Sequence, residues 1–189
     1  MSENSLRVVL VSLAATLLLA GCSGKELHVD YTDDYLKALI DTPGVKAQDR
    51  AAIENFILAM SDLKHAESKA RLEQAYAPEL YFNDTVHTYR TRADVVAYML
   101  KTADMVESLK VEVQDVAVKN NDYYLRWIMT MRFEISGDMI DSKSIGMTHI
   151  RTDSNGEVVI HQDYWDAVEG LYQYIPLVGY MIGKVQSRM

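Results

Sequence analysis

The clearest candidate for chemistry in this chain is Asp163, which lies in the stretch Gly156–Asp166, GEVVIHQDYWD. A turn signal at Asp153–Gly156 precedes the stretch, which reads as a strand. Because successive side chains of a strand point to opposite faces, His161, Asp163 and Trp165 share one face. A carboxyl group in an apolar pocket can act as a general acid or base, since burial disfavours its charged form. The stretch therefore predicts acid–base chemistry centred on Asp163, with His161 as a polar neighbour near the rim rather than the base.

Asp163 also has a purely structural interpretation. As an acid near a strand end, it could cap a neighbouring loop or pair with Arg126 or Arg151. Tyr81, in a short predicted strand, and Asp84, directly after that strand, could supply a tyrosine and a second acid near the pocket. The residues alone leave these alternatives open.

The sequence predicts neither a metal ion nor an organic cofactor. Its five histidines have no spacing typical of metal ligands, and it contains no glycine-rich phosphate loop and no nucleophile motif. The chain carries 19 Lys and Arg against 27 Asp and Glu, which gives a formal net charge of −8. Because an acidic protein repels the phosphates of nucleic acid, we do not expect a nucleic-acid partner.

Four predicted strands place the residues around Asp163. Apolar and polar residues alternate from Leu109 to Ala117 and again from Tyr123 to Glu134, with a turn at Lys119–Asp122. A further strand is expected at Lys143–Thr152, and the last one is the stretch that contains Asp163. The pattern predicts an antiparallel meander.

Three predicted helices precede these strands. Apolar residues recur at intervals of three and four after Asp49 and after Thr91, which are both plausible N-caps. A shorter helix is expected at Glu67–Tyr76, closed by Pro78, and a short strand follows at Glu79–Asn83. Helices segregated to one face of an antiparallel sheet define the α+β class. The sequence therefore predicts an α+β fold in which three N-terminal helices pack on a curved antiparallel sheet.

This order of elements, with the closing motif Gly-x-Val-x-x-His-x-Asp-Tyr-Trp-Asp, resembles the SnoaL-like branch of the nuclear transport factor 2-like superfamily. The resemblance covers residues 47–166. Members include ketosteroid isomerases, limonene-type epoxide hydrolases, polyketide cyclases and binding modules without catalysis. The resemblance implies a cone-shaped domain with an apolar pocket for a small hydrophobic molecule, and it leaves open whether the sheet forms a homodimer. The residues expected to line the pocket are Trp127, Met129, Met131, His161 and Trp165.

Two enzyme groups of this superfamily suggest more specific roles. Asp163 corresponds to the general acid in the Arg-Asp-Tyr-Phe-Asp strand of limonene-type epoxide hydrolases. Those enzymes also use an Arg and an Asp, two residues apart on an earlier strand, where this chain has Trp127 and Met129. The charge network that orients a water molecule is therefore missing. A pair like that of ketosteroid isomerase would require Tyr81 or Asp84 beside Asp163, so whether the protein is an enzyme stays open.

The N-terminus resembles a bacterial lipoprotein signal. Arg7 precedes an apolar run at residues 8–19, which is shorter than the roughly 20 residues that span a bilayer. The run continues into Leu19-Ala20-Gly21-Cys22, which is similar to a lipobox, and Cys22 is the only cysteine. The resemblance implies cleavage before Cys22 and its acylation, for example with palmitate, as a membrane anchor. Ser23 then favours the outer membrane, facing the periplasm, in a cell with two membranes.

Two segments flank the predicted domain. Residues 22–46 are expected to form a tether between membrane and domain, or alternatively an additional helix packed on the domain. Residues 167–189 are rich in apolar side chains and are expected to form a C-terminal helix. That helix either packs on the sheet or a partner subunit, or it lies on the bilayer beside the anchor.

Two functions from different classes follow from these observations. The preferred one is a membrane-anchored envelope lipoprotein whose apolar pocket binds a small hydrophobic molecule, with or without acid–base chemistry. The alternative is a non-catalytic envelope module that binds another protein through its sheet or its tail.

Overall fold

The computed structural model describes residues 31–189, which form one unit. The predicted signal sequence and the lipid-attachment residue Cys22 lie outside the described residues, so the anchor stays a prediction. Within the described part of the chain, no helix is both long and apolar enough to cross a bilayer.

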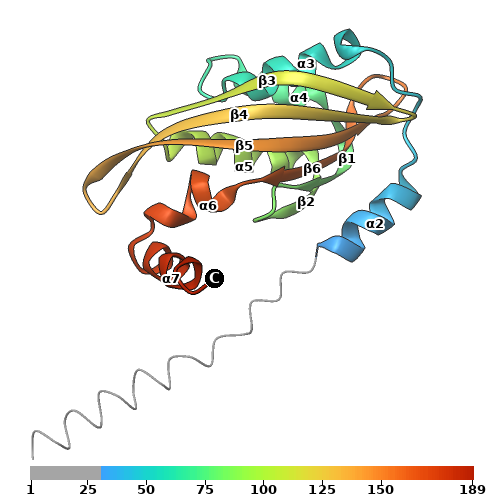
Figure 1. Cartoon of the computed structure of the whole chain (residues 1–189). Helices are drawn as coiled ribbons and strands as arrows, with labels where there is room; N and C mark the ends of the chain where they lie inside the picture. Colours follow the sequence, from blue (N-terminus) through green and yellow to red (C-terminus); the bar gives the residue numbers. More distant parts are fainter. Residues whose placement is uncertain (1–30) are drawn as a thin grey trace, which may run out of the picture. The chain divides into compact units, whose positions relative to one another are not determined.

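A curved six-stranded sheet forms the centre of this unit (Figure 1). Its spatial order is β2-β1-β6-β5-β4-β3, and neighbouring strands are antiparallel except β1 and β6, which run parallel. Strands β3 to β6 follow one another as a meander, as the period-two pattern predicts. The strands are β1 (Tyr76–Asn83), β2 (Thr88–Thr91), β3 (Ser108–Lys119), β4 (Asp122–Ile135), β5 (Asp138–Thr152) and β6 (Val158–Trp165).

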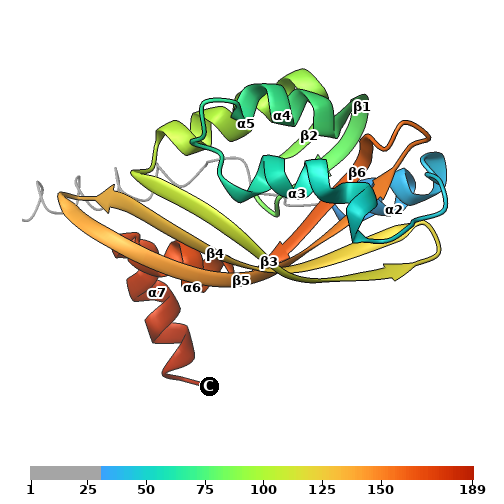
Figure 2. The same cartoon turned by 90° about the horizontal axis from the view of Figure 1, so that it is seen from above.

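Helices cover both faces of this sheet to different extents. Figure 2 shows α3, α4 and α5 together on one side of the curved strands, and we call this side the inner face. On the other side, Ala38 of α2 packs against Tyr81 and Ile160. The helical segments before the meander are α2 (Thr32–Asp41), the 3-10 helix η1 (Arg50–Ile53), α3 (Glu54–Ser61), α4 (Ser68–Ala75) and α5 (Arg92–Asp104).

The start of α5 shows how the sequence specifies a helix. The hydroxyl group of Thr91 accepts a hydrogen bond from the backbone N–H of Asp94, so Thr91 is the N-cap that the sequence predicts. Behind this cap, Val95, Val96 and Met99 recur at helical spacing and are buried in the core. The apolar stripe of α5 is thereby fixed on the inner face.

The pairing of β4 with β5 determines which side chains fill the inner face. Trp127 pairs with Gly146, and Leu125 pairs with Thr148. The Trp127 ring lies so close above Gly146 that a Cβ atom there would be 2.3 Å from the ring. Glycine is therefore required at this position, and the indole ring fills the core next to the sheet.

The α+β class is confirmed, but several details differ from the prediction. The sheet is mixed rather than purely antiparallel, because β1 runs parallel to β6. The sequence did not predict β2, which has only four residues. Part of the segment expected as a tether forms α2, which packs on the sheet and comes in addition to the three predicted helices. This matches the alternative interpretation of that segment; residues 22–30 lie outside the described part.

After β6 the chain continues in short helical pieces rather than in one helix. Asp166 caps the first piece, because its carboxylate accepts a hydrogen bond from the backbone N–H of Glu169. Pro176 begins the last piece, at a position where proline suits a helix. The pieces are α6 (Ala167–Gly170), η2 (Tyr172–Tyr174) and α7 (Pro176–Gln186).

Candidate functional site

Asp163 lies on the inner face and is held there by two hydrogen bonds. Its oxygen Oδ1 accepts one from Nε2 of His161 at 3.0 Å and one from the hydroxyl group of Thr148. The side chain of Asp163 is 16% exposed, whereas that of His161 is fully buried. Because both donors bind the same oxygen, Oδ2 is the oxygen that a ligand would meet.

The second ring nitrogen of His161 is also hydrogen-bonded. Its Nδ1 lies 2.7 Å from the hydroxyl oxygen of Tyr76, which is fully buried as well. A carboxylate can only accept, so the proton of a neutral His161 sits on Nε2 and Tyr76 donates to Nδ1. Burial, and then the charge of Asp163, raise the pKa of Tyr76 well above its usual value, so the hydroxyl group keeps its proton. Hydrogen bonds therefore run in one direction, from Tyr76 through His161 to Asp163.

A second branch reaches Asp163 from Trp127. The indole N–H of Trp127 donates to the hydroxyl oxygen of Thr148 at 2.8 Å, and that hydroxyl group donates in turn to Asp163. Every polar group of this branch thereby has a partner within the core. We call the five side chains of Tyr76, Trp127, Thr148, His161 and Asp163 the Asp163 network.

The other predicted pocket residues lie on the same face, but the space beside them is filled. Met131 is buried, and Met129 and Trp165 are partly buried in the same core. A Cβ atom on Gly170 of α6 would lie 2.6 Å from the Trp165 ring, so α6 packs directly on this residue. Where an open hollow was expected, the chain itself occupies this part of the inner face.

Two hydroxyl groups beneath this part of the chain are unpaired. Ser142 and Ser144 lie on β5, opposite Met131 and Met129, and both are buried. Among the described residues, neither hydroxyl oxygen has a hydrogen-bond partner. A buried polar group without a partner costs about 1–3 kcal/mol. The two serines therefore place unpaired polar atoms in an otherwise apolar part of the inner face.

Tyr81 is not brought to Asp163. It lies under α2, on the opposite side of the sheet from His161, because it alternates with Phe82 along β1. Its hydroxyl group donates to the side-chain oxygen of Gln162 at 2.9 Å. Tyr81 therefore joins α2 to the sheet and cannot serve as a partner of Asp163.

The carboxylate of Asp84 shapes the turn between β1 and β2. It accepts hydrogen bonds from the backbone N–H groups of Val86 and His87, and another from the hydroxyl group of Tyr98. Only the backbone of Asp84 approaches the predicted site. There the backbone carbonyl oxygen of Asp84 accepts a hydrogen bond from the indole N–H of Trp165 at 2.9 Å. Asp84 is thus a turn residue, and it helps to position Trp165.

Neither arginine considered as a partner of Asp163 reaches it. Arg126 pairs with Asp115 at the exposed surface of the sheet, and Arg151 pairs with Asp122. The interpretation of Asp163 as the partner of an arginine is therefore wrong, because the strand register sends both side chains elsewhere.

A similar network lies on the opposite face under α2. In His149, Nε2 is 2.8 Å from a carboxylate oxygen of Asp122, and Nδ1 is 3.0 Å from the hydroxyl oxygen of Tyr35. Arg151 binds Asp122 too and donates to backbone oxygens near the end of α2. Burial lowers the pKa of His149, while for Asp122 hydrogen bonds from Arg151 and His149 outweigh burial and lower the pKa. This second network fastens α2 to the sheet.

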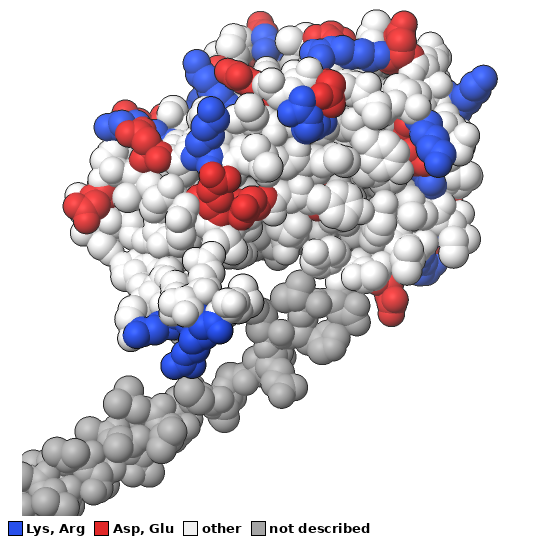
Figure 3. Space-filling model, in the orientation of Figure 1, with Lys and Arg blue, Asp and Glu red and all other residues white. Residues whose placement is uncertain are grey.

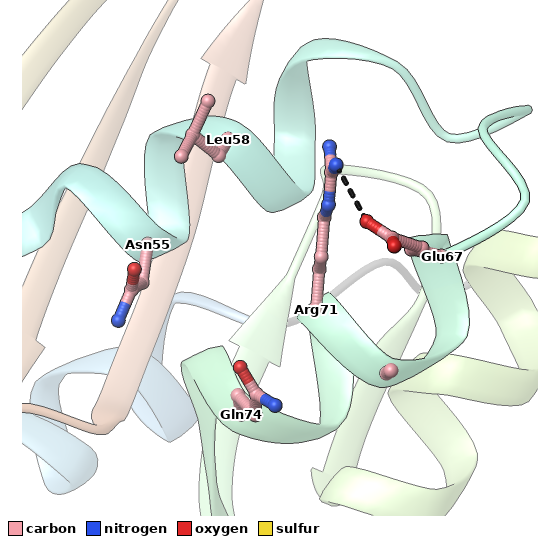
Figure 4. A pocket seen from close by; sticks show the side chains of 6 residues that line it. Asn55, Leu58, Glu67, Arg71 and Gln74 are labelled. Atoms are coloured by element: carbon pink, nitrogen blue, oxygen red, sulfur yellow. Dashed lines mark hydrogen bonds and ion pairs between the residues drawn. The ribbon is translucent and has the colours of Figure 1, made fainter.

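Two open depressions of the surface lie elsewhere. One is formed between α3 and α4, where Glu67 and Arg71 form an ion pair of 2.9 Å (Figure 4). Another lies between α4 and α5, beside Arg92 and Val96. No residue of the Asp163 network lines either of them. Within residues 31–189, no cluster of His, Cys, Asp and Glu side chains is suited to hold a metal ion.

The arrangement on the inner face is suited to one kind of proton transfer. Two donors hold the Asp163 carboxylate in a single orientation, and its free oxygen can exchange a proton with a bound molecule. His161 is fully buried and would act on a ligand only through Asp163.

The sequence patterns did not identify Tyr76, Thr148 or the two serines as residues of the site. Thr148 could have been found by counting along the last hairpin, because it pairs directly with Asp163. Tyr76 gives no such signal, since it reaches His161 from a strand that lies 85 residues earlier in the chain.

Comparison with known proteins identifies the family. The model of the SnoaL-like domain matches residues 57–161, which is more than half of the chain. The chain belongs to the SnoaL-like family. No curated protein matches it.

Solved structures share the fold of this SnoaL-like chain. TsrD from Streptomyces laurentii is 17% identical with a TM-score of 0.54, and the match covers 65% of this chain and 94% of TsrD. A hypothetical protein from Catenulispora acidiphila has a ketosteroid isomerase-like fold and was solved with trimethylamine. It is 14% identical with a TM-score of 0.55, over 66% of this chain and 92% of that protein. At such identities the similarity shows the fold alone.

Proposed function

We propose that this domain binds a small molecule with an apolar skeleton and at least one polar group on the inner face of its sheet. The observation that carries the proposal is the Asp163 network, a carboxylate held by two donors within an apolar core. Packing alone does not require such a network, because apolar residues of similar volume are often as stabilising as buried polar or charged groups. Membership of the SnoaL-like family supports a small-molecule role.

The residues beside the network suggest what the ligand resembles. Met129 and Trp165 offer apolar surface, and the unpaired hydroxyl groups of Ser142 and Ser144 offer hydrogen bonds to a polar atom. Because Gly170 lies against both Trp165 and Ser144, α6 has to move before a ligand can reach the Ser144 hydroxyl group. The proposal therefore includes an outward displacement of α6 on binding.

The proposal extends to acid–base catalysis through Asp163. Its free oxygen would take a proton from the bound molecule or return one to it. Asp163→Asn keeps an oxygen that can accept both hydrogen bonds but removes the group that exchanges the proton. With a ligand identified as described next, we expect this variant to bind it and to lose turnover; unchanged turnover would exclude Asp163 from that role.

The binding proposal can be tested with neighbouring residues of β4. Met129 and Ile128 are both half-buried and point to opposite faces of the sheet. Fractions of an organic envelope extract are added to the native protein, to Met129→Ala and to Ile128→Ala, and the melting temperature is measured. We expect a fraction that raises the melting temperature of the native protein and of Ile128→Ala, and raises it much less for Met129→Ala.

Two results would contradict binding on the inner face. Either no fraction raises the melting temperature of the native protein, or a fraction acts equally on both variants. If instead a fraction acts as expected, mass spectrometry of that fraction would identify the bound molecule.

A second candidate function is supported by the other face of the sheet. Ile145, Met147 and Tyr164 are exposed there side by side on β5 and β6, and they offer an apolar surface for another protein or for a second copy of this chain. A photo-cross-linking residue in place of Ile145 should then yield a protein adduct. Absence of any adduct, with ligand-dependent stabilisation intact, would favour the small-molecule proposal.

We also propose that the mature protein is anchored in the cell envelope through acylated Cys22, facing the periplasm from the outer membrane. The support is the lipobox-like sequence and the absence of any other cysteine. Cells fed a fatty-acid analogue should label the native protein and not Cys22→Ser. Label that persists in the variant would refute the anchor without affecting the binding proposal.

A further inference from the structure

The C-terminal helix α7 exposes apolar side chains over most of its surface. None of its residues is buried, and the side chains of Leu177 and Tyr180 are 71% and 63% exposed. Met181 and Val185 are exposed to a similar degree. A soluble domain rarely leaves so many large apolar side chains together in water without a binding function.

One side of α7 is used within the domain, and the other is not. Ile175, Gly179 and Ile182 follow one another at helical spacing and are partly covered. A Cβ atom on Gly179 would lie 2.1 Å from the backbone oxygen of Gln173, so this side packs closely on η2. The exposed apolar residues lie on the remaining surface, which is therefore free to bind something else.

The charged side chains of the segment that forms α7 are all basic. The last acidic residue of the chain is Glu169, and the segment after it carries only Lys184 and Arg188, although the chain as a whole has a net charge of −8. Figure 3 shows basic groups at the tip of the lobe that α7 forms. The ammonium group of Lys184 lies 5.5 Å from the centre of the Tyr180 ring. Basic groups beside an aromatic residue and apolar side chains are typical of a helix that lies in the boundary between lipid chains and headgroups.

We propose that α7 lies on the surface of a lipid bilayer with anionic headgroups and inserts its exposed apolar side chains between them. The eleven residues of α7 are far too few to span a bilayer, so the helix would lie along the surface. Charge complementarity favours this occupant, because Lys184 and Arg188 are opposite in charge to anionic headgroups, whereas the acidic remainder of the chain is repelled by them. The proposal does not depend on the inner face or on the acylation of Cys22.

A single fluorescent label tests the proposal in the full-length chain. Cys22→Ser removes the only cysteine, and Met181→Cys then places a polarity-sensitive fluorophore on α7. Gln114→Cys, on exposed β3, carries the same label as a control. Both proteins are mixed with vesicles of phosphatidylglycerol and phosphatidylethanolamine, and separately with vesicles of phosphatidylcholine alone.

We expect the label at position 181 to shift to shorter wavelength with the anionic vesicles, while the label at position 114 does not. Any attachment through the apolar N-terminal run is common to both proteins and cannot produce this difference. Replacing Lys184 and Arg188 by Gln should lower the vesicle affinity of α7 about 25-fold, at about fivefold for each basic residue near the surface.

Three results would overturn the proposal. The label at position 181 could stay unchanged with anionic vesicles, or both labels could shift equally. A shift that occurs without vesicles and grows with protein concentration would show that a second copy of the chain covers α7 instead.

Discussion

Replacing Ser144 by alanine should not destabilise this protein, although the residue is 1% exposed. Its hydroxyl group has no partner among the described residues, whereas water hydrates it in the unfolded chain. Burying it unpaired costs about 1–3 kcal/mol, and the replacement removes that cost together with the contacts of one oxygen atom. We therefore expect the free energy of unfolding to stay constant or to rise by up to about 2 kcal/mol.

Ser68→Ala is the matched control for this experiment. Ser68 is also 1% exposed, but its hydroxyl group lies within hydrogen-bonding distance of the backbone oxygens of Asp62 and His65, at 2.9 and 2.7 Å. Removing a hydroxyl group that is paired in the folded state costs about 1 kcal/mol. The two serine replacements should therefore differ in sign.

Urea unfolding followed by circular dichroism measures both variants. For a chain of this size, each kcal/mol corresponds to about 2–4 °C in melting temperature, so thermal melts should agree. Ser144→Ala should also weaken the stabilisation by an active extract fraction. If Ser144→Ala lost as much stability as Ser68→Ala, its hydroxyl group would be paired in the folded protein, and the reasoning about a polar position for a ligand would be refuted.

Three further predictions concern the two networks and the core. Tyr76→Phe removes the donor to Nδ1 of buried His161, so urea unfolding should show a loss of about 1–3 kcal/mol. Gly146→Ala forces a Cβ atom into the Trp127 ring, so urea unfolding should show a loss of about 1–3 kcal/mol, with a change in tryptophan fluorescence. The lowered pKa of His149 means that the unfolded chain binds a proton below about pH 6.5 that the folded chain does not. The contribution of His149 to the stability of the folded protein is therefore present above about pH 6.5 and declines as the pH falls below it. The melting temperature should accordingly decrease as the pH is lowered through this value.

Controls separate these effects from general damage. Tyr180→Phe changes an exposed tyrosine and should leave stability unchanged; a loss equal to that of Tyr76→Phe would contradict the first prediction. Unchanged stability of Gly146→Ala would show that the indole ring lies elsewhere. For the pH effect, the melting temperature of His149→Gln should depend less steeply on pH than that of the native protein. An equally steep dependence would assign the effect to other groups.

Local patterns predicted much of this fold. Alternating residues located the long strands around Trp127 and Asp163, and the N-cap Thr91 marked the start of α5, because these signals depend on residues close together in the chain. The parallel pairing of β1 with β6 could not be predicted in this way, since it joins segments that are distant in sequence. Strand β2 was missed because four residues are too few to show a period.

The candidate site was predicted in part for the same reason. The strand periodicity placed His161, Asp163 and Trp165 on one face, and the structure has them there. Tyr76 reaches this face through long-range strand pairing, which leaves no local trace in the sequence. Sequence patterns also report which face is apolar but not whether that face is hollow, and here α6 fills part of it at Gly170.

The most direct test of the account is nuclear magnetic resonance of the two tryptophan indole N–H groups, since Trp127 and Trp165 are the only tryptophans and both lie on the inner face. A ¹⁵N-labelled protein is titrated with the extract fraction that raises its melting temperature. The account predicts that both indole signals move, and that the Trp165 signal also reports the displacement of α6. If the melting temperature rises while neither indole signal moves, the ligand binds elsewhere and the inner face is not its site.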